Sequence, residues 1–150
     1  MNSGIEATMT TLLLTLILLA APLPPSLNAV RAEPNPDHRA KAAIDYAGVA
    51  EKNAETAYAQ GDMPRFAAQL KEIEDSLDAA QQAFNISGKT PGRNPGPYKY
   101  AEMHSRDLLI RLGDLEQRMD VSERGALRDL ISKVQTMHDA WFEGIMGRKR

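Results

Sequence analysis

The chain has 150 residues, with 18 basic and 20 acidic side chains and a formal net charge of −2. This near-neutral balance gives no reason to expect nucleic acid as a partner. There is no cysteine, which excludes disulfides, thiolate metal sites and the covalent attachment of c-type haem. A chain of this length is expected to form one domain, held together without disulfides by its apolar core.

The N-terminal part of the chain is expected to direct export. Residues 11–21, TLLLTLILLAA, form an uninterrupted run of apolar and weakly polar residues, and prolines follow it. The run is shorter than the roughly 20 apolar residues that a helix needs to cross a membrane. Val30 and Ala32 then occupy the two positions that a signal peptidase checks. We therefore predict that residues 1–32 are a signal peptide and that the protein is periplasmic or extracellular. The first ten residues lack Lys and Arg, which is unusual for a signal peptide and leaves a retained anchor as the alternative.

The first predicted helix runs over 36–60. Asn35 is suited to cap it, Pro36 fits its first turn, and Gly61 is expected to end it. Apolar residues recur at steps of three and four, which indicates one buried face. They are Ala40, Ala43, Ile44, Ala47, Ala50, Ala54, Ala57 and Tyr58. Because this stripe is mostly alanine, another helix could approach closely, either within the monomer or from a second copy.

A second helix is predicted over 63–85, with Asp62 as its cap. Its apolar residues alternate between steps of four and three, which is the heptad pattern of helices that pack at a shallow crossing angle. They are Phe66, Leu70, Ile73, Leu77, Ala80 and Phe84.

A Gly- and Pro-rich connector is predicted over 86–97. It contains a Gly-Lys-Thr triplet at 88–90, but a phosphate-binding loop would need glycine where Ala83 stands, and Pro91 interrupts the helix that should follow. Asn85 is a formal glycosylation acceptor, which matters only on a eukaryotic secretory route. The segment is long for a connection in a helical bundle, and long loops are sometimes binding elements.

The last two predicted helices run over 98–119 and 121–146. Asp120 and Glu123 have the spacing of a capping box at the start of the final helix. The stripe of the third helix consists of Ala101, His104, Leu108, Leu112, Leu115 and Met119. The stripe of the fourth consists of Leu127, Leu130, Ile131, Val134, Met137, His138, Trp141, Phe142 and Ile145.

No segment shows the alternating apolar pattern of a strand. Short turns at Gly61 and Asp120 make two helical hairpins, which the connector joins. We therefore predict an all-α fold in which residues 33–150 form an antiparallel four-helix bundle, most simply up-down-up-down.

Two Met-His dipeptides mark a candidate metal site. If the last two helices form an antiparallel hairpin that turns at Asp120, then His104 and His138 lie at one level of the bundle, within about a turn of each other. Histidine pairs in bundle cores can bind a transition metal or haem b, and thioether sulfur from Met103 or Met137 would suit copper(I). The sequence places no third strong ligand, and a histidine at a core edge is also an ordinary core residue.

In outline, the exported, cysteine-free four-helix plan resembles that of the periplasmic b-type cytochromes. The resemblance covers architecture and no motif, because the methionine that such bundles use early in the first helix is absent. It implies haem b as a conceivable cofactor. In an up-down bundle, the first turn of the first helix lies near the end of the fourth, so His38 and His138 are conceivable ligands.

The chain has no H-E-x-x-H motif, no G-x-S-x-G motif and no cysteine nucleophile. We therefore predict a non-enzymatic binding or assembly module that recognises an unknown protein partner or a second copy of itself. The alternative is a bundle that binds a metal or haem b through His104 and His138. Membrane contact would involve only the signal segment or the basic tail at 148–150.

Overall fold

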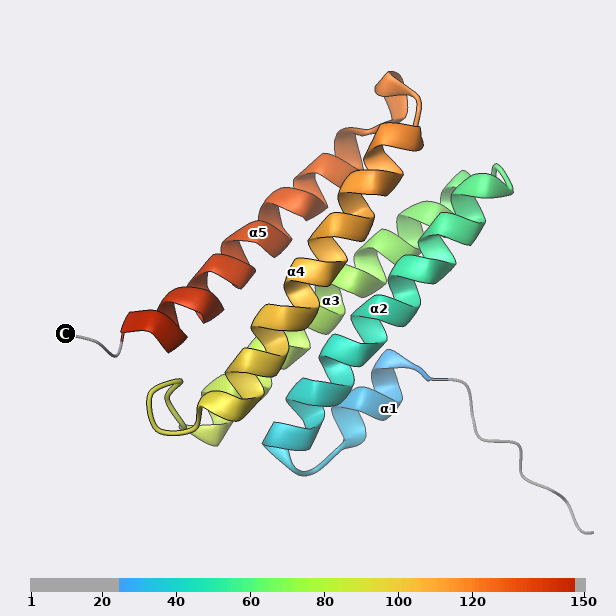
Figure 1. Ribbon diagram of the computed structural model, residues 1–150. Helices are drawn as coiled ribbons and strands as arrows, with labels where there is room; N and C mark the ends of the chain where they lie inside the picture. The colour runs from blue at the N-terminus through green and yellow to red at the C-terminus, as the bar shows by residue number, and fades with distance from the viewer. Residues whose placement is uncertain (1–24, 148–150) are drawn as a thin grey trace, which may run out of the picture.

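The computed structural model describes residues 25–147. This part of the chain is helical and contains no strand, so the predicted all-α helical bundle is confirmed (Figure 1). Its elements are α1 (Leu27–Ala32), α2 (Pro36–Ala59), α3 (Met63–Ser87), α4 (Pro95–Arg118), the 3-10 helix η1 (Val121–Glu123) and α5 (Gly125–Met146). None of these helices is both long enough and apolar enough to cross a membrane.

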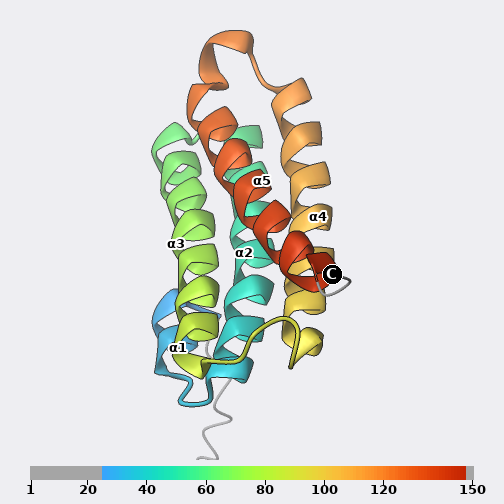
Figure 2. The same ribbon diagram turned by 90° about the vertical axis from the view of Figure 1, so that its left-hand side faces the viewer.

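The long helices form two antiparallel hairpins, α2 with α3 and α4 with α5 (Figure 1). The hairpins lie side by side, so that α2 contacts α4 and α3 contacts α5. Because the chain reverses direction at each connection, the two helices of each such pair run the same way (Figure 2). The registers of the two pairs agree: Glu51 bonds to Arg111 and Gln81 bonds to Trp141, each across a separation of 60 residues.

Most predicted helix ends are found where the capping residues place them. The side chain of Asn35 accepts hydrogen bonds from the N–H groups of Asp37 and His38, and Asp62 accepts one from the N–H of Arg65. Gly61 has a φ of 70°, a left-handed conformation that glycine adopts without strain. The α2–α3 turn therefore follows the prediction.

The connector is shorter than predicted and covers 88–94. Helix α4 already begins at Pro95, because a proline in the first helical turn lacks only an N–H that has no partner within the helix. Pro91 packs on α5 at Gly144: a Cβ added to Gly144 would lie 2.8 Å from Cγ of Pro91. The connector is thus fitted against the end of α5 (Figure 2).

The predicted capping box at the start of the final helix is wrong. Asp120 makes no side-chain capping bond, and the segment after it forms η1, so that α5 begins at Gly125. The carboxylate of Glu123 accepts a hydrogen bond from the hydroxyl of Tyr58 at 2.9 Å, and the N–H of Asp120 donates to the same hydroxyl at 3.1 Å. Both groups therefore bind α2 and not the first turn of α5.

The predicted stripes form the core most completely in the first hairpin. Every alanine predicted for the α2 stripe is buried, and so is every member of the α3 stripe. Helix α5 buries fewer of its predicted residues, and Phe142 is 46% exposed. Near the connector, the ring of Phe84 stacks on Tyr98 with 4.3 Å between centroids and meets the edge of Trp141 at 6.0 Å. These three rings thus link α3, α4 and α5 at this end of the core.

The predicted signal peptide is described only at its end, because residues 1–24 lie outside the described part. Its residues 27–32 form α1, whose Leu27 and Val30 are each only 7% exposed. Arg39 of α2 holds the following link by donating to the backbone oxygen of Glu33 at 2.7 Å. Cleavage after Ala32 stays a prediction, and it would remove a helix that packs against α2 and α3.

Candidate functional site

A pocket of about 190 Å³ lies between α2 and α4, and we call it the α2/α4 pocket. Three of its lining residues, Ile44, Leu77 and Leu108, are apolar and buried. Polar side chains from the two helices complete its lining, and they include Lys52 and Arg111. An apolar interior with a few polar groups is the usual composition of a small-molecule site.

The wall of this pocket contains one half of a buried ion pair. The side chain of Glu51 is fully buried, and its Oε2 accepts a hydrogen bond from Nε of Arg111 at 2.8 Å. Its Oε1 has no hydrogen-bond partner among the described residues. Burial disfavours the charged carboxylate more than Arg111 favours it, so the pKa of Glu51 is raised above its ordinary value.

Arg111 connects this buried carboxylate to the pocket. Its side chain is 40% exposed and lines the pocket, while its Nε is fixed by Glu51. The two terminal nitrogens of Arg111 make no hydrogen bond to any residue between 25 and 147. Gly48 leaves the facing part of α2 without a side chain: a Cβ added there would lie 3.5 Å from Nη2 of Arg111. Donors of Arg111 are therefore available at the pocket wall.

The remaining charges around the pocket leave a positive balance. Asp45 lines the pocket, but it accepts a hydrogen bond from Lys41 at 2.9 Å and another from the hydroxyl of Tyr100. Lys52 is exposed and forms no ion pair within the described part of the chain. The carboxylates of Asp45 and Glu51 thus have cationic partners, whereas Lys52 has none.

The structure places the two predicted metal ligands at one level of the bundle but gives them different neighbours. Nδ1 of His138 lies 3.0 Å from the hydroxyl oxygen of Ser105, which directly follows His104, so the predicted register of this hairpin is correct. The ring of His104, however, packs on Tyr100 at 4.0 Å between centroids and lines the α2/α4 pocket. The ring of His138 stacks on Phe142 on α5.

No third ligand joins these histidines in the described residues. Nε2 of His138 is 4.0 Å from Oε1 of Glu102, and no group of three or more His, Asp or Glu side chains between 25 and 147 is placed to hold a metal ion. The described residues therefore supply no set of three such ligands for a metal ion. A site using His104 and His138 stays a prediction.

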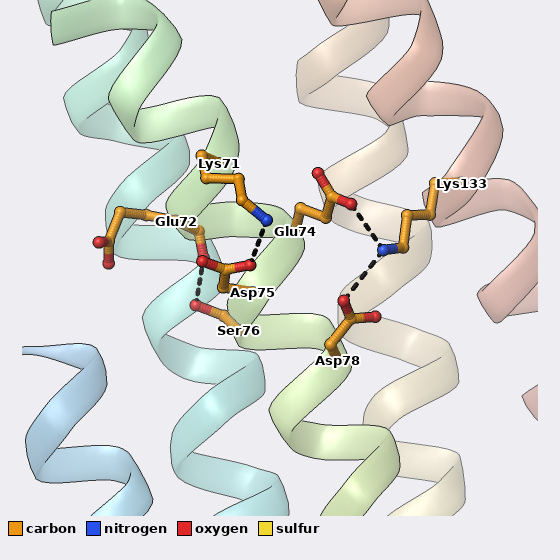
Figure 3. A network of polar contacts seen from close by, with 7 residues as sticks. All are labelled: Lys71, Glu72, Glu74, Asp75, Ser76, Asp78 and Lys133. Atoms are coloured by element: carbon orange, nitrogen blue, oxygen red, sulfur yellow. Dashed lines mark hydrogen bonds and ion pairs between the residues drawn. The ribbon is translucent and has the colours of Figure 1, made fainter.

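The largest ionic network outside the pocket lies between α3 and α5 (Figure 3). Nζ of Lys133 donates to Glu74 at 2.8 Å and to Asp78 at 3.0 Å, and Lys71 pairs with Asp75 at 2.7 Å. The hydrogen bond from Lys133 lowers the pKa of Glu74. The side chains that meet at Lys133 are all partly exposed. This network ties two helices together at the surface, beside a hollow of about 330 Å³ that Lys71, Glu74 and Lys133 help to line.

Sequence reasoning identified only one polar residue of the α2/α4 pocket as a candidate, His104. It missed Glu51, although this residue lies between Ala47 and Ala54 on the face that the alanine stripe defines. A carboxylate at that helical position was a usable signal of a buried charge. Arg111 had the same signal, because it lies between Leu108 and Leu115 of its own stripe, but the pairing of the two residues depends on how the two hairpins pack.

No protein-family model, curated protein or solved structure matches this chain. The geometry of the fold and of the α2/α4 pocket therefore carries the functional argument.

Proposed function

We propose that this protein is an exported, non-enzymatic binding module and that the α2/α4 pocket is its ligand-binding site. One observation supports this proposal: the pocket combines buried apolar residues with two cationic side chains, Arg111 and Lys52. Among the described residues, both have hydrogen-bond donors without a partner. Such a site fixes an apolar ligand body by burial and orients it with a few polar contacts.

The volume of the pocket limits its ligand. Drug-sized ligands occupy pockets of roughly 300 to 1,000 Å³. The volume here is about 190 Å³, which makes the expected ligand a small organic molecule.

Binding is favoured over hydrolysis by the state of the one serine in the pocket lining. Ser105, His138 and Glu102 have the residue types of a catalytic triad, but Ser105 is only 1% exposed. Its hydroxyl is also within hydrogen-bond distance of the backbone oxygen of Glu102, at 3.0 Å, which competes with His138 for its proton. The 4.0 Å between Nε2 of His138 and Oε1 of Glu102 is also too long for the hydrogen bond that would orient the imidazole.

Assembly through the alanine stripe, the other form of the predicted module, is less well supported. The alanines of α2 are buried within one chain, where α3 packs against them. They therefore offer no free face to a second copy.

The binding proposal is tested by titrating the ¹⁵N-labelled chain with a library of small organic fragments and following amide shifts by NMR. We expect shifts that cluster at Gly48, Lys52 and Arg111. The variant Gly48→Met should abolish them, because its side chain enters the pocket. Gly113→Met is the matched control, since a Cβ at Gly113 meets no atom within 4 Å. Fragments that shift only other regions, or that bind Gly48→Met equally well, would overturn the proposal.

Export is tested by measuring the mass of the protein recovered from the periplasm or the culture medium. We expect a processed chain, and its mass also shows whether α1 is kept. Cleavage before Leu27 would leave α1 on the bundle, whereas cleavage after Ala32 would remove it. An uncut chain confined to the cytoplasm would exclude export.

A further inference from the structure

We infer that the ligand of the α2/α4 pocket is a small organic carboxylate with an apolar body, held by the terminal nitrogens of Arg111 with Lys52 as the second cation. This inference rests on the proposed function and adds the chemical class of the ligand.

Arg111 is oriented for a ligand before one binds. Its Nε is bonded to Oε2 of Glu51, a fully buried residue of α2. A guanidinium that is held through Nε keeps the donors of both terminal nitrogens in one plane, and this fork matches the two oxygens of a carboxylate. At Gly48 no side-chain atom of α2 stands against Nη2, which a Cβ at this position would contact at 3.5 Å.

The charges in the lining favour an anion. Glu51 is paired with Arg111, and Asp45 is bonded to Lys41 and Tyr100. Lys52 has no ion-pair partner in the described part of the chain and lines the same pocket. A cationic ligand would therefore meet an unpaired lysine and a guanidinium, whereas a carboxylate would neutralise them.

The apolar part of the lining sets the second requirement. Ile44, Leu77 and Leu108 are at most 5% exposed and form the buried side of the pocket. An inorganic anion such as phosphate would leave these side chains without a partner, while a compact apolar group would cover them. A small aromatic or branched aliphatic acid satisfies both parts of the site.

The test uses matched probes that differ only in charge: benzoate, benzamide and benzylamine, each followed by the amide shifts of the pocket residues. At about 10 mM, a probe with a Kd near 1 mM is largely bound. We expect benzoate to bind the pocket at least about tenfold more tightly than benzamide, a difference typical of a charge-assisted bidentate contact. Benzylamine should not bind.

Variants of the pocket show which residues recognise the negative charge of benzoate. Arg111→Gln alone would leave Glu51 unpaired, so the double variant Glu51→Gln/Arg111→Gln is used. It should still fold and should lose the preference for benzoate over benzamide. Lys52→Gln should weaken benzoate binding, and Glu51→Gln should strengthen it because the guanidinium is then unneutralised. Lys99→Gln, at an exposed residue of α4 that does not line the pocket, should change nothing.

The outcomes separate the two proposals. If benzamide binds as well as benzoate, or if benzylamine binds better, the pocket is a ligand site and the carboxylate inference is wrong. If the benzoate preference persists in the double variant, Arg111 is not the group that reads the charge, which also overturns the inference. If none of the three probes shifts the pocket residues, both proposals fail for ligands of this size.

Discussion

The two hairpins pack through two pairs of parallel helices, α2 with α4 and α3 with α5. In each pair, a side-chain hydrogen bond joins two residues that are 60 positions apart in the sequence. The first pair buries a carboxylate at Glu51 and encloses a pocket beside its partner Arg111. The second pair keeps its charges at the surface, where Lys133 joins two partly exposed carboxylates. Nearly the same register therefore supports an ion pair with a fully buried carboxylate on one side of the bundle and one with partly exposed carboxylates on the other.

This difference supports the proposal that the α2/α4 pocket is the binding site. A buried carboxylate loses its hydration, and its pairing with the partly exposed guanidinium of Arg111 is often no more stabilising than apolar residues of the same size. Glu51 also leaves Oε1 without a partner among the described residues. The α2–α4 pair therefore retains a feature that packing alone does not require, whereas a surface network such as that of Lys133 is ordinary for a soluble helix pair.

Removing Arg111 should have the largest effect. In Arg111→Gln the buried carboxylate of Glu51 has no cation, and loss of one partner of a buried pair destabilises a protein by about 3 to 5 kcal/mol. Urea unfolding at neutral pH should show this loss, and it should diminish at acid pH as Glu51 takes up a proton. Glu51→Gln/Arg111→Gln should regain most of the stability. A loss below about 1 kcal/mol, or no recovery in the double variant, would mean that the pair is not truly buried.

The second prediction concerns α1, which extends the α2 side of the comparison. A hollow under α1 shares the lining residues Asp45 and Val49 with the α2/α4 pocket. A chain that begins at Glu33 lacks Leu27 and Val30, and full burial of such a side chain contributes about 1.5 to 3 kcal/mol each before the entropy of ordering is subtracted.

We expect that shortened chain to be about 2 kcal/mol less stable than one that begins at Pro25, as measured by urea unfolding. Leu27→Ser/Val30→Ser in the longer chain is the control, and it should reproduce most of the loss. Equal stability of the two chains would show that α1 is not a working part of the bundle.

The α3–α5 pair contains one buried polar bond, and breaking it should have an intermediate effect. The indole N–H of Trp141 donates to Gln81 at 2.9 Å, and Trp141 is only 2% exposed. Gln81→Met leaves this donor unpaired, which should destabilise the fold by about 1 to 2 kcal/mol. The chain has a single tryptophan, so its emission reports the change directly. Gln82→Met, at the exposed neighbouring position, should be nearly neutral.

Substitution of Glu51 tests whether its pKa is raised in the folded state. The folded state favours the protonated form, so the contribution of Glu51 to stability is largest at low pH and is lost as the pH rises through the folded-state pKa. Glu51→Gln removes this loss and should be about 1 kcal/mol more stable than the parent at neutral pH. The advantage should shrink towards pH 4 in parallel urea titrations. A variant that is less stable at neutral pH would show that the ion pair outweighs desolvation.

The sequence predicted the features that each helix carries by itself. Asn35 and Asp62 cap the N-terminal ends of α2 and α3 as predicted, and the apolar stripes of these two helices form much of the core. The turn between the last two helices also set the level of His138 opposite Ser105, because the register of a hairpin follows from its turn. Periodicity and capping report local geometry, and that is why these predictions succeeded.

The features that the sequence did not predict depend on contacts between the hairpins. Glu123 fits a capping box by spacing, but its carboxylate binds Tyr58 on α2. The contact of Glu51 with Arg111 requires parallel packing of α2 on α4, which neither helix encodes in its own periodicity. The α2/α4 pocket is formed at that interface. The sequence could therefore indicate the character of each lining residue, but not which residues line the pocket together.

The smallest effect is expected at the surface network of α3 and α5 (Figure 3). Lys133→Met keeps the apolar stem of the side chain and removes its bonds to Glu74 and Asp78. Exposed ion pairs contribute about 0 to 1 kcal/mol, so the loss should be at most about 1 kcal/mol in low salt and smaller still in high salt, where the charges are screened. Urea unfolding at both salt concentrations measures it. A loss as large as that of Arg111→Gln, and insensitive to salt, would mean that both interfaces hold their charges in the same way and that the buried pair at Glu51 is not distinctive of the pocket side.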